Sequence, residues 1–241
     1  MTHILESADW SSPALALLSS FKKLDPFKPI IMHIRHTERF EPTENENSNL
    51  ALSTSRGKQA ALEFGESLPL NRRYRLYHTH VGRAKETAEG IRMGIVSRGG
   101  NATIVGIIPA SLALDNDACQ EYIRQLQKKY GKTEGVVKFV YRWCAGLIPP
   151  KIACPSYEFS QTVASYTFSN LRRAPTDTVD IYISHDTWIA ALLFHWFGEP
   201  LPEDGINFLE GFIMQPREND ITLYVRDRKI VVEYPYWWSK L

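Results

Sequence analysis

The sequence has few cysteines and no long apolar run. Its 241 residues include three cysteines, Cys119, Cys144 and Cys154, without the paired spacing of a redox motif or a zinc site. A disulfide framework is therefore not expected, and reduced thiols favour a cytoplasmic location. No apolar stretch is long enough to cross a bilayer. Residues 1–28 also lack the basic start and long apolar core of a signal peptide.

A strong excess of charge of either sign is also missing. Lysine and arginine number 28 and aspartate and glutamate 27, so the formal net charge is +1. A nearly neutral chain has no global field to attract nucleic acid or an anionic membrane, and neither is expected as a partner. Any attraction for an anion must therefore be local.

Short apolar segments alternate with segments of helical periodicity along most of the chain. The apolar segments at 30–34, 74–77, 103–108 and 179–183 predict strands, and helical patterns, such as the one at 53–68, separate them. Three further strands are expected at 208–214, 221–226 and 230–234. This order predicts an α/β fold, a three-layer sandwich with a mostly parallel central sheet and helices on both faces.

Residues 109–157 interrupt the alternation. Two helices are expected there, at about 117–130 and 134–145, followed by the pair Pro149 and Pro150. The whole chain, 1–241, is therefore expected to form a single domain with a helical cap inserted at 109–157.

Unusual polar residues follow three of the expected strands. Arg35 and His36 follow the first, residues 78–83 follow the second, and His185 and Asp186 follow the strand at 179–183. Active sites of open α/β sheets form outside the carboxyl ends of the strands. The topology therefore predicts that these residues meet at one edge of the sheet.

A histidine surrounded by arginines suits phosphate chemistry. His36 can attack phosphorus only as the neutral imidazole, and nearby positive charge lowers a histidine pKa. Guanidinium groups also grip phosphate oxygens bidentately, and Arg35, Arg39 and Arg83 could form such a clamp. Arg83 would lie in the first turn of a helix, where free N–H groups favour an anion.

The departing oxygen of a phosphate ester needs a proton donor. Asp186 is the first candidate, one residue after His185. A helix N-terminus and arginines both favour its carboxylate form, whereas a bound phosphate dianion favours the protonated form, so the protonation state is left open.

Four segments resemble the histidine phosphatase superfamily and occur in the family's order. Residues 34–39 (IRHTER) resemble its RHG motif in the RHxxR form, and residues 183–187 (ISHDT) resemble the HD dipeptide of its acid phosphatase and phytase branch. The other two segments, similar to conserved helix starts of the family, are 52–60 (LSTSRGKQA) and 77–88 (YHTHVGRAKETA).

The resemblance implies a role for each matching residue. His36 would carry the phosphoryl group and Asp186 would donate the proton, while the phosphate would be held by Arg35, Arg39, Arg83 and His185. Glu38 is the alternative acid, because the phosphoglycerate mutase branch of the family often has glutamate near this point. The chain departs from the family's pattern at Thr37, where glycine is usual, and at His78 and His80, where small residues or proline are usual. A metal site built on these histidines is not expected, since their spacing is a poor match to zinc ligands.

These inferences predict a metal-independent phosphomonoesterase without a cofactor. Its expected substrate is a small phosphorylated metabolite or sugar phosphate, selected by the inserted cap. A phosphoglycerate-mutase-like phosphotransferase and a non-catalytic phospholigand-binding module remain as alternatives. The aromatic segment 234–238 is expected to close the core, and it would offer a homodimer contact if it were exposed.

Overall fold

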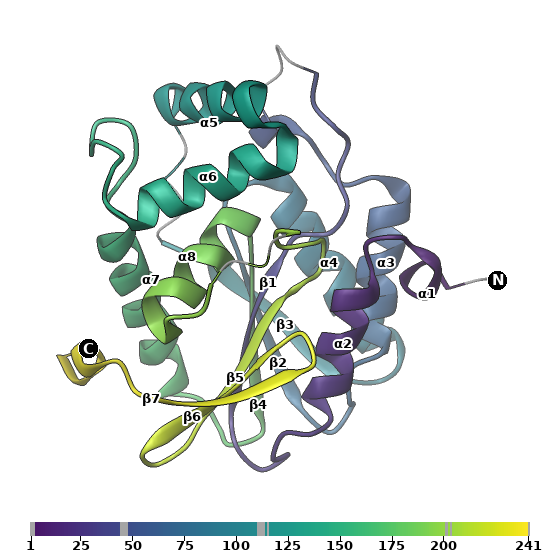
Figure 1. The fold of residues 1–241 in the computed structure, drawn as a ribbon. Coiled ribbons are helices and arrows are strands. Elements are labelled where there is room, and N and C mark those ends of the chain that lie inside the picture. The colour runs from purple at the N-terminus through teal and green to yellow at the C-terminus, as the bar shows by residue number, and fades with distance from the viewer. Residues whose placement is uncertain are drawn as a thin grey trace. The chain divides into compact units, whose positions relative to one another are not determined.

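A mixed seven-stranded sheet organises the computed structural model, which describes residues 3–43, 48–109, 114, 116–200, 202 and 204–240. The strand order is β3-β2-β4-β1-β5-β6-β7 (Figure 1). The strands are β1 (Ile30–Arg35), β2 (Arg73–His78), β3 (Asn101–Ile107), β4 (Thr178–Ser184), β5 (Gly211–Pro216), β6 (Asp220–Val225) and β7 (Arg228–Glu233).

The α/β class predicted from the sequence is confirmed, and β1 to β4 lie within two residues of the predicted strands. The pairs β3–β2, β2–β4 and β4–β1 are parallel. The pairs β1–β5, β5–β6 and β6–β7 are antiparallel, so the pairing is less parallel than expected. For β5–β6 and β6–β7 the reason is local, because short turns join these strands and such connections allow only antiparallel neighbours.

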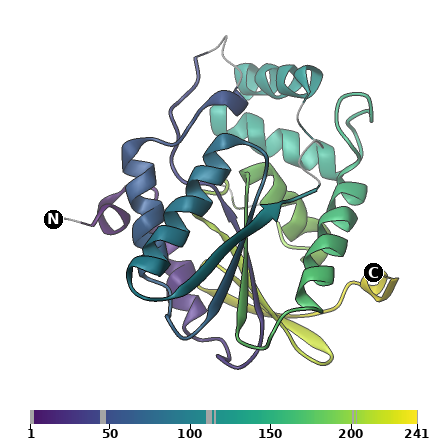
Figure 2. The ribbon, with the colours of Figure 1, turned by 180° about the vertical axis from the view of Figure 1, so that it is seen from behind.

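Four helices share one core with one face of the sheet. They are α1 (Ile4–Ser7), α2 (Ser12–Phe21), α3 (Ser55–Glu66) and α4 (Gly82–Ser97). Alternate residues of β1, including Met32 and Ile34, are fully buried with them, as the two-residue period of a strand requires. Figure 1 shows these helices gathered on one side of the sheet, and Figure 2 shows them from behind.

The chain divides into two compact units. The first contains Met1–Ile107, Arg173–His185 and Asn207–Tyr234, and thus the whole sheet. The second contains Ile108–Arg172, Asp186–Ile206 and Pro235–Leu241. Its helices are α5 (Asp117–Tyr130), α6 (Lys132–Cys144), α7 (Ser156–Leu171) and α8 (Asp186–Phe197).

The second unit includes most of the cap that was expected at 109–157. Helices α5 and α6 form as predicted, but the unit also takes in α7 and α8, because Phe159 of α7 packs against Trp143 and Trp188. Residues 110–113 and 115 of the expected cap lie outside the described residues. A single domain with an inserted cap stays a prediction.

The aromatic C-terminal segment packs inside the second unit. Trp237 and Trp238 are buried, and the ring centroid of Trp238 lies 4.2 Å from that of Phe168. The core-closing role expected of the two tryptophans is thus confirmed, while Tyr236 is exposed. Homodimer formation stays a prediction. The helices of the described residues include none with the length and apolarity to span a membrane.

Candidate active site

The ends of β1, β2 and β4 meet at one edge of the sheet. These strands are neighbours in the order β2-β4-β1, and all three run parallel. Past the strand ends, the His36 amide donates to Ser184 O (2.9 Å) and the Thr79 amide donates to Ile183 O (3.2 Å). The predicted meeting of the residues after these strands is therefore confirmed, since the His36 ring lies beside that of His185 and His185 contacts Thr79.

The buried ring of His36 is held in one tautomer. Its Nδ1 lies 2.7 Å from Thr37 O, and because a carbonyl oxygen only accepts, Nδ1 carries the proton. Its Nε2 lies 2.9 Å from Arg83 Nε, which only donates. Nε2 therefore presents a lone pair, the state that a nucleophilic imidazole requires.

The surroundings of His36 favour its neutral form. Burial lowers its pKa well below the ordinary 6.5, and the positive charges of Arg83 and Arg35 and the neighbouring His185 lower it further. Only the hydrogen bond to Thr37 O acts in the opposite direction. His36 is thus uncharged at neutral pH.

Arg83 connects the two histidines of this edge. It lies in the first turn of α4 and is buried, and its Nη1 donates to Ser48 O at 2.7 Å. Its Nη2 lies 3.4 Å from His185 Nδ1, and Thr79 Oγ1 lies 3.1 Å from His185 Nε2. The rings of His36 and His185 are 5.4 Å apart. The Arg83 guanidinium therefore donates to the lone pair of His36 and lies beside the ring of His185.

Sequence reasoning missed Phe208, which lies beside the predicted site. The guanidinium carbon of Arg35 is 4.4 Å from the Phe208 ring centroid, and the His36 ring is 5.9 Å from it. The edge of Trp10 packs against the same ring at 5.5 Å. No local pattern could have indicated this, because Phe208 is distant in sequence from all three partners.

The loop that carries Phe208 is held in a strained conformation. Leu209 has φ +57°, which is uncommon for a residue with a branched side chain. The loop is held by Glu210, whose carbonyl accepts from the Arg35 amide (2.8 Å) and whose buried carboxylate accepts from Arg226 Nε (2.6 Å). These contacts fix the backbone conformation of the loop next to Arg35.

Thr37 joins the nucleophile's loop to two helices. Its amide donates to Thr87 Oγ1 (3.0 Å) in α4, and its hydroxyl donates to Gly57 O (2.8 Å) in α3. Position 37 does not have a positive φ, so its backbone does not need the glycine usual in the family. Gly57 is required instead, since a Cβ there would lie 2.3 Å from Glu38 O.

Glu38 is part of a hydrogen-bonded cluster and is a poor proton donor. Its carboxylate accepts from Trp10 Nε1 (3.2 Å), Thr54 Oγ1 (2.6 Å) and Arg56 Nε (3.0 and 3.1 Å). The hydrogen bond from Arg56 is the main reason that the Glu38 pKa falls to about 2. At neutral pH Glu38 therefore stays a carboxylate, which argues against the alternative acid.

Two predicted site residues have other contacts. Arg39 Nη1 donates to Phe40 O (3.1 Å), and its backbone forms a bridge with Ser53. Asp186 is the first residue of α8, in the second unit, and its Oδ1 accepts from the Thr187 amide (2.8 Å). The roles of Arg39 and Asp186 stay predictions.

The remaining histidines of this region have structural contacts. His78 is buried with Nδ1 2.7 Å from Thr79 O, and His33 stacks between Tyr182 (4.6 Å) and Phe212 (5.1 Å). Within the residues that the structure describes, no group of three or more histidine, cysteine, aspartate or glutamate side chains could hold a metal ion.

The fold is shared with solved structures of phosphatases and mutases, although neither a protein-family model nor a curated protein matches the sequence. The alpha-ribazole phosphatase from Shigella flexneri matches 83% of this chain and 96% of its own, with a TM-score of 0.52 and 18% identity. The mycobacterial glucosyl-3-phosphoglycerate phosphatase matches 86% and 99% (TM-score 0.54, 14% identity). The phosphoglycerate mutase from Bacillus anthracis matches 87% and 94% (TM-score 0.51, 12% identity).

These likenesses cover most of each chain and establish the class of fold. The chain has the histidine phosphatase fold, as its sequence motifs predicted. At 12–18% identity the likeness extends to the fold alone.

Proposed function

We propose that this protein is a metal-independent phosphomonoesterase that transfers the phosphoryl group of its substrate to His36. One observation carries the proposal: a buried, neutral imidazole whose Nε2 lone pair faces Arg83, next to Arg35 and His185. A group held in this way can attack phosphorus without first losing a proton.

The reaction proceeds in two in-line steps. His36 Nε2 forms a bond to phosphorus as the ester P–O bond breaks, and Asp186 gives its proton to the departing alcohol oxygen. A water molecule then attacks the phosphohistidine, Asp186 takes a proton from it, and phosphate leaves with His36 restored. Arg35, Arg39, Arg83 and His185 hold the phosphoryl oxygens and stabilise their charge in the transition state.

Substrate binding requires one rearrangement in this scheme. The Nε–H of Arg83 now donates to the atom that must attack phosphorus. A bound phosphate oxygen would accept this hydrogen bond from Arg83 in place of His36 Nε2, and the Nε2 lone pair would become free to attack. The arginine that now donates to His36 would thus also hold the substrate.

The proposed substrate is a small phosphorylated metabolite or sugar phosphate. Similar structures are named as an alpha-ribazole phosphatase, a glucosyl-3-phosphoglycerate phosphatase and a phosphoglycerate mutase. A mutase would return the phosphoryl group to a second hydroxyl instead of to water, so the fold is compatible with both outcomes.

Turnover in water labelled with heavy oxygen tests the proposal. The purified chain, with EDTA present, is offered a panel of phosphate esters that includes alpha-ribazole 5′-phosphate, glucosyl-3-phosphoglycerate, phosphoglycerates and sugar phosphates. We expect labelled inorganic phosphate from at least one ester, unaffected by EDTA. His36→Ala should reduce the rate by at least about a thousandfold, and His3→Gln, at an exposed histidine outside the candidate site, is the matched control.

Three outcomes would contradict the proposal. Isomerised ester without labelled phosphate would indicate a mutase. Binding of esters without any turnover would indicate a phospholigand-binding module. Loss of activity in EDTA, restored by a metal ion, would exclude the metal-independent mechanism.

A further inference from the structure

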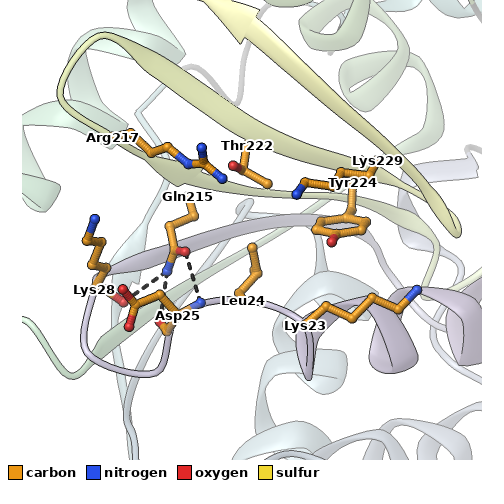
Figure 3. Close-up of a pocket in the computed structure, with 9 residues that line it drawn as sticks. All are labelled: Lys23, Leu24, Asp25, Lys28, Gln215, Arg217, Thr222, Tyr224 and Lys229. Carbon is orange, nitrogen blue, oxygen red and sulfur yellow. Dashed lines mark hydrogen bonds between the residues drawn. The ribbon is translucent and has the colours of Figure 1, made fainter.

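A polar pocket of about 410 Å³ lies in the first unit, at the opposite end of β1 from His36 (Figure 3). Its lining residues are Lys23, Leu24, Asp25, Lys28, Gln215, Arg217, Thr222, Tyr224 and Lys229. Lys28 lies two residues before β1 and His36 one residue after it, and the six-residue strand spans about 20 Å. The pocket is therefore separate from the candidate active site.

The pocket wall is built on paired strands. Gln215 lies opposite Thr222 across β5 and β6, and Tyr224 lies opposite Lys229 across β6 and β7. Directly opposed residues and residues two apart along a strand share one face, so these four side chains project from the same side of the sheet.

The segment between α2 and β1 forms the other side of the pocket. The Gln215 amide accepts from the Asp25 amide (3.1 Å) and donates to Asp25 O (2.9 Å), as the dashed lines in Figure 3 show. Gln215 is buried. The pocket thus lies between one face of the sheet and a segment that is hydrogen-bonded to that face.

Positive charge accumulates in this pocket. Its lining has four cationic side chains and one carboxylate, an excess of three charges in a chain whose net charge is +1. The carboxylate, Asp25, already accepts from the Phe27 amide (2.9 Å). Arg217 pairs with the Asp220 carboxylate (Nε–Oδ1 3.7 Å) and Lys23 lies over the Tyr224 ring (5.7 Å), whereas among the described residues no carboxylate forms an ion pair with Lys28 or Lys229. Such a group of like charges is unfavourable unless an anion compensates it.

A buried hydroxyl in the pocket has no hydrogen-bond partner. Thr222 is 3% exposed, and its Oγ1 finds no acceptor or donor in the structure. Burying a hydroxyl in this state is costly, so a missing partner is indicated. In Figure 3 the guanidinium of Arg217 and the ammonium of Lys229 both extend toward Thr222.

We infer that this pocket binds a small phosphorylated anion at a second site, independent of catalysis at His36. The planar fork of Arg217 suits two oxygens of a phosphate, Lys28 and Lys229 supply point charges, and the Thr222 hydroxyl donates to a phosphate oxygen. A volume of about 410 Å³ lies within the range of small-molecule sites.

Calorimetric titration with inorganic pyrophosphate tests the inference. We expect wild-type protein to bind it at this site, with an affinity that falls as salt rises. Lys28→Gln combined with Lys229→Gln should weaken that binding by at least about tenfold. Arg172→Gln combined with Arg173→Gln removes the same charge from exposed positions outside both the pocket and the expected cap and is the matched control.

A second variant separates binding from folding. Thr222→Val keeps the shape of the side chain and removes the unpartnered hydroxyl, so its melting temperature should equal or exceed that of the wild type while pyrophosphate binding weakens several-fold. Hydrolysis of phosphate esters should be unchanged in all these variants. Equal pyrophosphate affinity and stoichiometry in the pocket variant and its control would overturn the inference, whether or not the protein proves to be a phosphatase.

Discussion

At the scale of single residues, the candidate site gives different charge states to two titratable groups that lie two positions apart in the chain. His36 is buried among cations and stays neutral, whereas Glu38 is bonded to Arg56, Thr54 and Trp10 and stays charged. Each state suits a different task. A neutral imidazole can attack phosphorus, and a permanent carboxylate can anchor the loop but cannot release a proton at neutral pH.

Substitution of the two candidate acids should distinguish them. Asp186→Asn should slow hydrolysis of an alkyl phosphate by roughly 10²–10⁴-fold, the usual contribution of a general acid. The same substitution should slow hydrolysis of p-nitrophenyl phosphate much less, because p-nitrophenolate departs without a proton. The ratio of kcat/KM for the two esters is the measurement.

Glu38→Gln provides the comparison in the same assay. Because the Glu38 pKa is about 2, this variant should leave the ratio of the two esters unchanged. If Glu38→Gln selectively lost activity on the alkyl ester and Asp186→Asn kept the wild-type ratio of kcat/KM, Glu38 would be the proton donor instead.

The positions of single residues could be predicted from the sequence where a motif follows directly after a strand. Arg83 and His185 come next to His36 because β2, β4 and β1 are adjacent and parallel. Phe208 could not be predicted, because its position depends on a strained turn and on the buried ion pair of Glu210. Such long-range contacts leave no periodic pattern in the sequence.

At the scale of elements, Thr37 connects the loop after β1 to α3 and α4. Its two hydrogen bonds join elements that the sequence alone showed only as separate helices. The residue that departs from the family's glycine thus has a structural task, which its position in the sequence did not show.

Replacement of Thr37 by glycine should therefore destabilise the protein. Thr37→Gly loses the hydroxyl bond to Gly57 O and adds backbone freedom to the unfolded chain, for an expected loss of about 2 kcal/mol in the free energy of unfolding. Thr37→Ser keeps both hydrogen-bonding groups and should lose less than half of that. Urea denaturation provides the measurement, and equal stability of the glycine and wild-type proteins would contradict this role.

At the scale of the whole molecule, a row of stacked rings crosses the sheet. Tyr77, Tyr182, His33 and Phe212 lie on adjacent strands with centroid separations of 4.7, 4.6 and 5.1 Å. Burial lowers the pKa of His33 from 6.5 to about 3. The unfolded chain therefore takes up a proton below pH 6.5 that the folded chain cannot bind until about pH 3.

This difference predicts how stability depends on pH. The stability linked to neutral His33 is complete above pH 6.5 and is lost progressively between pH 6.5 and 3, by roughly 1.4 kcal/mol per pH unit. His33→Phe keeps an aromatic ring in the stack and removes this proton uptake, so its unfolding free energy should fall less steeply with acid. His80→Gln is the control, and identical slopes for His33→Phe and wild type between pH 6 and 4 would be inconsistent with a buried neutral His33.

The class of fold could be predicted from the sequence, but the extent of the compact units could not. Strand–helix alternation placed β1, β2 and β4 correctly because buried parallel strands are short apolar segments between turns, and it also placed β3, an edge strand without a buried residue. The second unit combines three separate stretches of chain through aromatic packing, such as Trp238 against Phe168. That assembly depends on tertiary contacts, so the periodicity that predicts single helices does not show which of them belong to one unit.

The central claim, that His36 accepts the phosphoryl group, can be tested by trapping the intermediate. The protein is mixed with a phosphate ester that it hydrolyses and is quenched within milliseconds in alkali, which preserves phosphohistidine. The phosphorylated peptide is then identified by mass spectrometry. We predict phosphate on the peptide that contains His36, formed no more slowly than turnover and absent in His36→Ala. Steady turnover with no phosphohistidine at any time, or phosphate on another residue, would contradict the account.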